Sequence, residues 1–181
     1  MTIQFKQDKN DLLKHQLYVA SKSERIKKKR RRSKIFFPLI YIVFAVMAFF
    51  EGNSSGVFLF FLVALLWFFL YPIWEKHHYI KHYKGYINEN LSQRFEKTIT
   101  LELNNDYIFS QLEGSESKVS TQELNEIIEI DTVIFLQLKD TQIFVLPKDK
   151  INNIEALIER LKQLADHLKI NYTLEKNWKW E

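Results

Sequence analysis

The sequence predicts an α+β membrane protein, in which a two-helix transmembrane hairpin is joined to a small antiparallel β-rich domain. Two observations carry this prediction. Residues 35–50 and 57–74 form apolar runs that contain no charged residue. After residue 97, apolar and polar residues alternate in short segments, which is typical of antiparallel strands. The chain has 181 residues, so it has room for one small domain beside the hairpin.

Residues 1–34 are predicted to hold a strand, a helix and a basic juxtamembrane segment. Thr2–Lys6 alternates polar and apolar residues and predicts a short strand that joins the sheet of the later domain. Asp8 or Asn10 is a suitable N-cap for a helix that reaches about Ala20. We expect this helix to continue through the basic segment into the first span.

The hairpin occupies residues 35–74. At about 1.5 Å per residue its two runs are roughly 24 and 27 Å long, close to the thickness of a hydrocarbon core. A buried hairpin in a soluble core is disfavoured because neither run keeps a polar face. A cleaved signal peptide is disfavoured because no small-residue cleavage site follows the first run. The lack of polar groups favours an anchor over a transport pathway.

The charges around the spans predict the orientation of the hairpin. Nine of the thirteen residues from Lys22 to Lys34 are basic, whereas the loop at residues 51–56 has no Lys or Arg. The positive-inside rule therefore places both termini in the cytoplasm of a two-pass cell-membrane protein. A nucleic-acid arm is disfavoured because the segment adjoins a membrane span. The residues expected to set the topology and bind anionic lipid headgroups are Lys27, Lys28, Lys29, Arg30, Arg31, Arg32 and Lys34.

Residues 75–96 are predicted to continue the second helix to about Leu91, with Gly85 as a point where it bends or ends. Tyrosine and tryptophan gather around this end of the span, as expected of anchors at headgroup level. His77, His78 and His82 form the only histidine cluster, and an i, i+4 pair can hold a divalent metal. Since that face offers no third ligand beyond a possible Glu75, we predict an interfacial role and neither metal nor cofactor.

Residues 97–181 are predicted to form a β-rich domain with a C-terminal helix. Turns are expected at 104–106, 113–116 and 139–141, a helical turn at 121–124, and an amphipathic helix at Ile151–Lys169. A bent sheet closed by a terminal helix resembles the PH-like architecture, by analogy of fold. The predicted strands are Thr98–Leu103, Tyr107–Leu112, Ser117–Ser120, Ile127–Asp131, Val133–Leu138 and Gln142–Leu146.

The layout resembles the YcxB-like family of bacterial membrane proteins. Its most specific match is the pair of segments Asp131–Leu138 and Thr141–Lys148, where a strand is followed by a strand ending in Pro-Lys and then by a helix. One departure is Leu124, where the family leads us to expect an aromatic residue. The resemblance implies a fold and a bacterial inner-membrane location. It implies no activity, so it assigns no catalytic residue.

The sequence carries no motif of enzyme chemistry. It has no cysteine, which excludes disulfides, thiol catalysis and cysteine metal sites, and favours a cytoplasmic domain. Its four glycines are isolated, so no phosphate loop is present, and no nucleophile elbow or zinc motif appears. We interpret the acidic residues of the sheet as solvated strand faces, namely Glu102, Glu123, Glu126, Glu129 and Asp131.

These features predict a non-enzymatic inner-membrane protein whose cytoplasmic domain binds a protein partner or lipid headgroups, and no nucleic acid. Alternatives are a membrane immunity protein against a secreted toxin, an accessory subunit of a transporter or signalling complex, and an enzyme with its site in the sheet. The amphipathic tail Trp178-Lys179-Trp180 is expected to dock on headgroups or on the domain.

Overall fold

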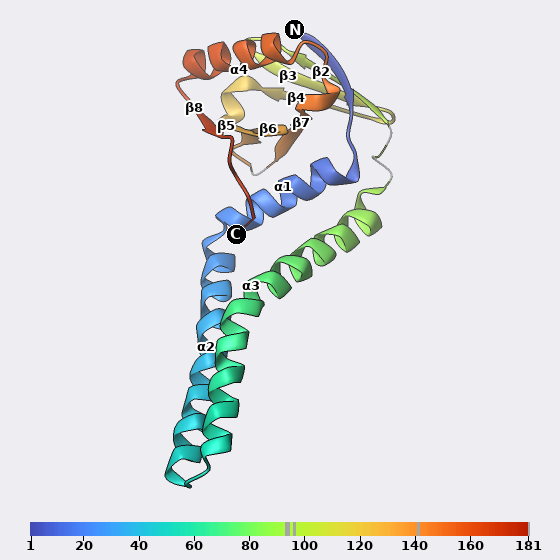
Figure 1. The fold of residues 1–181 in the computed structure, drawn as a ribbon. Coiled ribbons are helices and arrows are strands. Elements are labelled where there is room, and N and C mark those ends of the chain that lie inside the picture. The colour runs from blue at the N-terminus through green and yellow to red at the C-terminus, as the bar shows by residue number, and fades with distance from the viewer. Residues whose placement is uncertain (93–94, 96, 141, 181) are drawn as a thin grey trace. The chain divides into compact units, whose positions relative to one another are not determined.

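The computed structural model describes residues 1–92, 95, 97–140 and 142–180. The chain forms two compact units. The first, called here the β-rich domain, contains Met1–His15 and Lys84–Lys179, and the second, called the hairpin unit, contains Gln16–Tyr83 and Trp180. The predicted α+β class is confirmed, because two long apolar helices accompany antiparallel sheets (Figure 1).

The first sheet of the β-rich domain has four strands in the order β1-β2-β3-β4. All neighbouring strands are antiparallel, and β1 pairs with β2 from Thr2 opposite Glu102 to Lys6 opposite Thr98. The prediction that the N-terminal strand joins this sheet is therefore confirmed. The strands are β1 (Thr2–Lys6), β2 (Thr98–Leu103), β3 (Tyr107–Leu112) and β4 (Ser115–Ser120).

The second sheet also has four strands, in the order β7-β6-β5-β8. The strands are β5 (Leu124–Ile130), β6 (Val133–Leu138), β7 (Ile143–Pro147) and β8 (Asn171–Glu175). Short 3-10 turns, η2 (Thr121–Glu123) and η3 (Lys148–Lys150), precede β5 and follow β7. The predicted turn at 139–141 includes Thr141, which lies outside the described residues.

Strand β8 corrects two expectations. It follows helix α4 (Ile154–Leu168), so the helix is not the last element, and it pairs parallel to β5, so this sheet is not wholly antiparallel. The reversal occurs at Lys169, whose left-handed backbone (φ 56°) ends the helix. A parallel edge strand needs a crossover, and α4 provides it.

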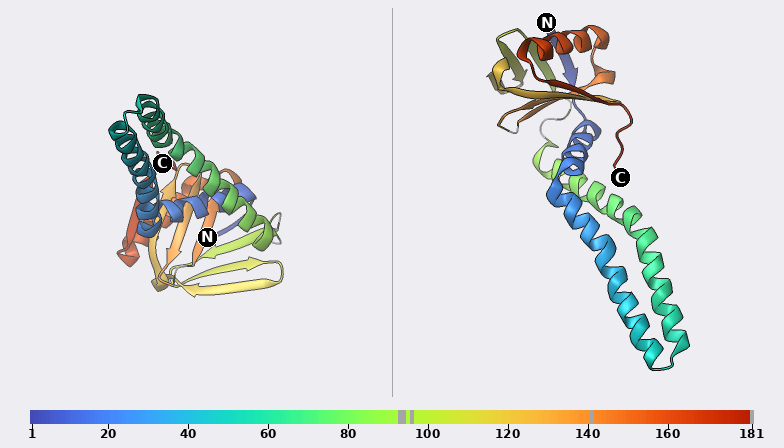
Figure 2. Two further views of the ribbon diagram at one scale, coloured as in Figure 1. Left: turned by 90° about the horizontal axis from the view of Figure 1, so that it is seen from below. Right: turned by 90° about the vertical axis from the view of Figure 1, so that its left-hand side faces the viewer.

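The core of the β-rich domain lies between α4 and the two sheets (Figure 2). Leu157, Leu161 and Leu164 are spaced along one face of α4 and are buried. They belong to one cluster with residues of both sheets, including Leu101 and Leu136. The predicted amphipathic helix is therefore confirmed, with its ends at Ile154 and Leu168.

The other face of the second sheet is met by the start of helix α1 (Lys9–Lys22). Asp8 caps this helix as predicted, because its Oδ1 accepts from the backbone N–H groups of Asn10 (2.7 Å) and Asp11 (3.0 Å). Lys14 Nζ donates to Thr132 Oγ1 at 2.8 Å, and the ring of His15 lies 5.5 Å from that of Phe135. The second sheet is thus covered on both faces within this domain.

The hairpin unit is built from α2 (Glu24–Phe50) and α3 (Ser54–Asn90), which run side by side (Figure 1). The predicted continuity of the first helix into α2 is wrong. Ser23 is extended (φ −68°, ψ 114°) and its side chain accepts from the Ile26 N–H, so α1 ends and a new helix begins. Helix α3 reaches Asn90, as predicted, and does not end at Gly85.

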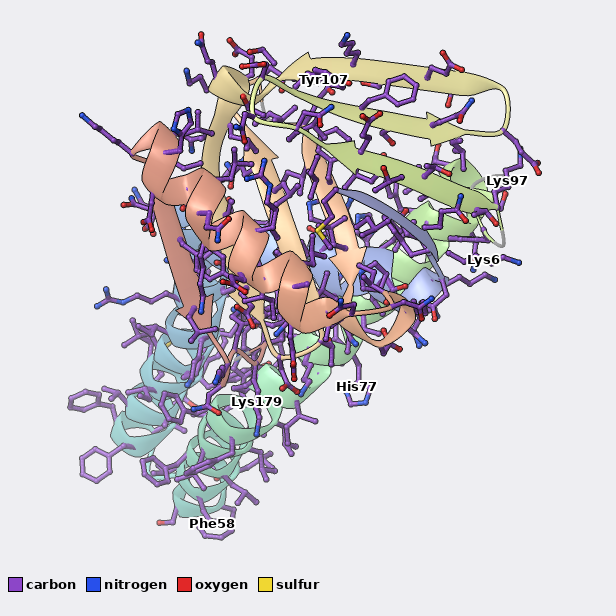
Figure 3. The ribbon with its side chains drawn as sticks, turned by 90° about the horizontal axis from the view of Figure 1, so that it is seen from above. Lys6, Phe58, His77, Lys97, Tyr107 and Lys179 are labelled. Carbon is purple, nitrogen blue, oxygen red and sulfur yellow. The ribbon has the colours of Figure 1, made fainter. Side chains whose placement is uncertain are left out.

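The apolar side chains of the hairpin face outward. In the most apolar 18-residue stretch of each helix, only 17% of α2 and 11% of α3 is buried. The buried positions are mostly small, such as Ala45, Ala48 and Ala64, whereas Phe50 is 82% exposed. Phe58 projects away from both ribbons (Figure 3). The two helices are long and apolar enough to span a membrane, and their exposure is the reverse of that of helices in a soluble core.

Candidate functional site

The basic segment forms the first turns of α2. Lys27, Lys28, Lys29, Arg31 and Arg32 are exposed, and because they are nearly consecutive they surround the helix. Such a collar presents positive charge in all directions at the base of the apolar run. The two remaining predicted residues differ, since Lys34 lies 4.6 Å above the ring of Phe68 and Arg30 is turned inward.

Arg30 forms the buried centre of this end of the hairpin. Its Nε donates to Glu75 Oε2 at 2.8 Å, and the Tyr71 hydroxyl donates to Glu75 Oε1 at 3.2 Å. Glu75 is only 4% exposed. The sequence grouped Arg30 with the headgroup-binding residues, and in the structure its guanidinium pairs with a carboxylate that α3 buries.

Trp180 completes this centre. Its ring lies 4.7 Å from the Arg30 guanidinium and 5.1 Å from the Tyr79 ring, and its side chain is buried. The tail was expected to dock on headgroups or on the β-rich domain, but its final tryptophan packs against the hairpin. The local sequence offers no signal for this contact, because a guanidinium and an indole far apart in the chain make it.

A cavity of about 420 Å³ opens beside the ion pair. Helix α2 contributes Lys29, Ser33 and Phe37, which are spaced by four residues and so lie on one face. Helix α3 contributes aromatic and polar side chains from Trp67 to His82. The same spacing of four in Trp67, Tyr71, Glu75 and Tyr79 is the signal by which the sequence could have revealed this wall.

Aromatic rings form a continuous wall along the cavity. The Phe37 and Trp67 rings are 4.8 Å apart, Trp67 stacks on Tyr71 at 5.5 Å, and Trp74 stacks on His78 at 5.3 Å. Rings in such offset stacks hold one another in place. The wall runs from the apolar part of the hairpin to its basic end.

The three clustered histidines of α3 do not share one face of the helix. His78 and His82 line the cavity, whereas His77 Nδ1 donates to the Ile73 carbonyl oxygen (2.8 Å) and the ring projects outward (Figure 3). Within the part of the chain that the structure describes, no three His, Asp or Glu side chains are grouped closely enough to hold a metal ion. His78 and His82 contribute polar ring nitrogens to the cavity lining.

Among its described residues, the β-rich domain buries two carboxylates, Asp11, which pairs with Lys150 at 2.5 Å, and Glu129. Glu129 was expected on a solvated face, but it is 5% exposed. The register explains this, because Glu129 lies opposite Ile134 and shares the face of Ile127 that turns to the core. Lys148 Nζ donates to Glu129 Oε1 at 2.6 Å, and the Tyr172 hydroxyl donates to Oε2.

The titration of this cluster follows from its contacts. Burial opposes ionisation of Glu129, but the hydrogen bonds from Lys148 and Tyr172 outweigh it, so the pKa of the carboxyl lies below its usual value. Burial, and next the bond to Glu129, raise the pKa of the Tyr172 hydroxyl. None of the three cavities described in this structure is lined by these residues. The arrangement lies on the core-facing side of the second sheet.

The other two cavities lie on the β-rich domain, and each measures about 480 Å³. One lies at the β3–β4 turn and is lined by Glu113, Ser115 and Glu116 among others, without a cationic or imidazole side chain. The second is formed by residues 1–4 with Asn152 and Asn153. Of the three, the cavity in the hairpin unit is the one that combines a cationic side chain, imidazole rings and an aromatic wall, so it is the strongest candidate site.

Comparisons with models of protein families, with curated proteins and with solved structures find no match for this chain.

Proposed function

We propose that this chain is a non-enzymatic, two-span bacterial membrane protein that binds anionic lipid headgroups through the collar of α2. The observation that supports the proposal most is the continuity of α2. A single helix passes from exposed basic residues to exposed apolar residues without a break. A bilayer is the environment in which both surfaces are solvated, since its apolar core adjoins an anionic surface.

The collar is strong enough to matter energetically. Each Lys or Arg near an anionic surface contributes about 1 kcal/mol, so five exposed residues contribute roughly 5 kcal/mol at low salt. The attraction decays over about 10 Å at 0.1 M salt, so it acts only on lipids close to the helix. It also sets the orientation, because the turn at the other end of the hairpin carries no Lys or Arg.

The orientation can be tested directly because the chain has no cysteine. We would place one cysteine at Ser55, exposed in the first turn of α3 beside the hairpin turn, or at Ser115, in β4, and treat intact cells with a membrane-impermeant maleimide. The proposal expects labelling at Ser55→Cys in intact cells and at Ser115→Cys only after lysis. Equal labelling of both sites in intact cells would disprove the two-span arrangement with a cytoplasmic domain.

Headgroup binding needs a separate experiment. The protein would be extracted in polymer-bounded native discs, and the ratio of anionic to zwitterionic lipid in the discs would be measured. Replacing Lys28, Arg31 and Arg32 by Gln should reduce the anionic enrichment, while Lys139→Gln, an exposed charge of the β-rich domain, should not. Unchanged enrichment in the triple variant would contradict the role of the collar.

We further propose a PH-like, YcxB-like domain that presents a surface to a protein partner. Two four-stranded sheets that share one apolar core with α4 support the PH-like assignment, with the hairpin inserted in the chain between β1 and β2 and with β8 as an addition. Strand β4 ends the first sheet and is largely exposed. An edge of this kind can accept a strand from another protein.

Photo-cross-linking tests the partner hypothesis. A photoreactive residue at Ser117 on β4 should trap one protein in membranes, and the same residue at the exposed Asn152 should not. A transporter or signalling subunit in the adduct would favour the accessory-subunit alternative, and a secreted toxin would favour the immunity alternative. Identical adducts from both positions would contradict a role for the β4 edge.

A further inference from the structure

We propose that the cavity between α2 and α3 holds one phospholipid molecule as a specific ligand, with its phosphate at the Lys29–Ser33 end and its glycerol-ester region beside Trp67. This inference rests on the membrane insertion proposed above and adds a defined site to the less specific attraction of the collar. It concerns a single lipid bound between helices, and not the lipids that surround the hairpin.

The lining of the cavity is amphipathic along the helix axes. Lys29 and Phe37 are eight residues apart, which corresponds to about 12 Å along a helix. Lys29, Ser33, His78 and His82 supply hydrogen-bond donors at one end, while Phe37 and Trp67 supply apolar surface at the other. A ligand that fits both ends must carry a polar head and an apolar continuation.

The charge of the lining selects an anionic head. Glu75 is the only carboxylate in the lining, and its charge is met by the Arg30 guanidinium at 2.8 Å and by the Tyr71 hydroxyl. Lys29, by contrast, is exposed at the entrance. An ammonium, a hydroxyl and imidazole nitrogens match the oxygens of a phosphate, which accepts several hydrogen bonds.

Trp67 distinguishes a lipid from free phosphate. Its Nε1 is buried and finds no acceptor among the described residues, and Trp67 lies well inside the apolar run of α3. An unpaired N–H at that depth is unfavourable, because no water is present to accept its hydrogen bond. The ester carbonyl of a phospholipid supplies an acceptor near this depth, which inorganic phosphate does not.

The test is lipid titration of the delipidated, full-length protein followed by native mass spectrometry. The probes are phosphatidylglycerol, phosphatidylcholine and soluble glycerol 3-phosphate. We expect one phosphatidylglycerol per protein, weaker phosphatidylcholine binding, and no complex with glycerol 3-phosphate. Binding of glycerol 3-phosphate as tight as that of phosphatidylglycerol would overturn the assignment to a lipid and leave a phosphate site.

Matched variants place the ligand in the cavity. Lys29 and Ser33 line the cavity and are replaced in the variants Lys29→Gln and Ser33→Ala, while Lys81→Gln removes an exposed charge of α3 that lies outside both the lining and the collar. We expect Lys29→Gln to weaken binding about tenfold or more, the usual loss of a charge-assisted bond, and Lys81→Gln to change it less than about twofold. Equal affinities in the two variants would overturn the site.

A second readout reports on the buried donor. Trp67→Phe keeps an aromatic ring but removes the N–H, so bound phosphatidylglycerol should dissociate faster than from the wild type. An unchanged dissociation rate would remove Trp67 from the site.

The two proposals fail in different ways. If cysteine labelling places the hairpin in the membrane but no stoichiometric lipid is retained, only the proposed lipid site in the cavity fails. If the labelling itself fails, the proposed function fails.

Discussion

The hairpin unit and the β-rich domain each bury one carboxylate against a cation and a tyrosine hydroxyl. In the hairpin, Glu75 receives bonds from Arg30 and Tyr71. In the domain, Glu129 receives bonds from Lys148 and Tyr172. Glu75 forms part of a cavity wall, whereas Glu129 lies on the core-facing side of a sheet. The same polar arrangement therefore lines a cavity in one unit and lies on a core-facing sheet in the other.

The two units also distribute apolar side chains in opposite ways. In the domain, Leu101, Leu136 and Leu161 are fully buried. In the hairpin, the buried positions are mostly alanines and the large side chains point outward. The domain is stabilised by its own core, while the hairpin leaves most of its apolar side chains exposed on two helices long enough to span a membrane.

Removing the buried carboxylate of Glu129 should have the largest effect on stability. Glu129→Ala leaves the partly buried Lys148 without its counter-charge and the Tyr172 hydroxyl without its acceptor, and breaking a buried pair in this way costs about 3–5 kcal/mol. Hydrogen–deuterium exchange of the full-length protein should show the loss in the most protected amides of β5 and β6. Glu75→Ala is the matched variant, and it should leave those amides unchanged. Equal effects of both variants on the domain would refute the independence of the two clusters.

Shortening a core leucine should have the next largest effect. Leu161→Ala creates a cavity between α4 and the sheets and should destabilise the domain by about 2–5 kcal/mol. Leu66→Ala, at an exposed position of α3, should change stability by less than about 0.5 kcal/mol. The same exchange measurement in lipid discs compares them. A large loss from Leu66→Ala would mean that the outer face of α3 is packed against protein.

Acid should weaken the domain through His15, which packs on Phe135. Burial lowers the pKa of its imidazole from 6.5 to about 4. The folded state therefore holds neutral His15, and its contribution is full above pH 6.5 and is lost as the pH falls towards 4. From pH 6.5 to 5 the loss should be about 2 kcal/mol, since each pH unit corresponds to about 1.4 kcal/mol.

Urea unfolding followed by circular dichroism at pH 7 and pH 5 measures this dependence. The His15→Gln variant, which does not titrate, should show a smaller difference between the two pH values than the wild type. An equal difference in both proteins would assign the acid sensitivity to other groups.

The smallest effect is expected at the surface of the collar. Lys27 pairs with Glu24 at 2.8 Å, but both side chains are largely exposed. Lys27→Ala should change stability by less than about 1 kcal/mol, because solvent screens the pair. Thermal unfolding of the variant in detergent provides the check, and a shift as large as that of Glu129→Ala would contradict this ranking.

Local patterns predicted much of the β-rich domain. Strands β1, β2, β3 and β6 have the predicted ends, because alternation of side chains is visible within a single strand. Strand β8 was not predicted, because its partner β5 is separated from it in the chain by two strands and helix α4. The cap at Ser23 was also missed, although Ser is a favoured N-cap residue.

The candidate site was predicted only in part. The collar was found because charge next to an apolar run is a property of adjacent residues. The pairing of Arg30 with Glu75 and the packing of Trp180 were not predicted. Both bring together residues of α2, of α3 or of the chain end that are far apart in the sequence.

By itself, the sequence determined the two apolar helices, the basic collar, most strands and the amphipathic α4, because each depends on the order of neighbouring side chains. Only the tertiary structure decided which residues of the collar face outward, which carboxylates are buried, and where a cavity forms. Those properties arise where residues far apart in the chain meet, as Arg30 meets Glu75 and Glu129 meets Tyr172. Burial and pairing belong to the contact between elements, and no single stretch of sequence encodes them.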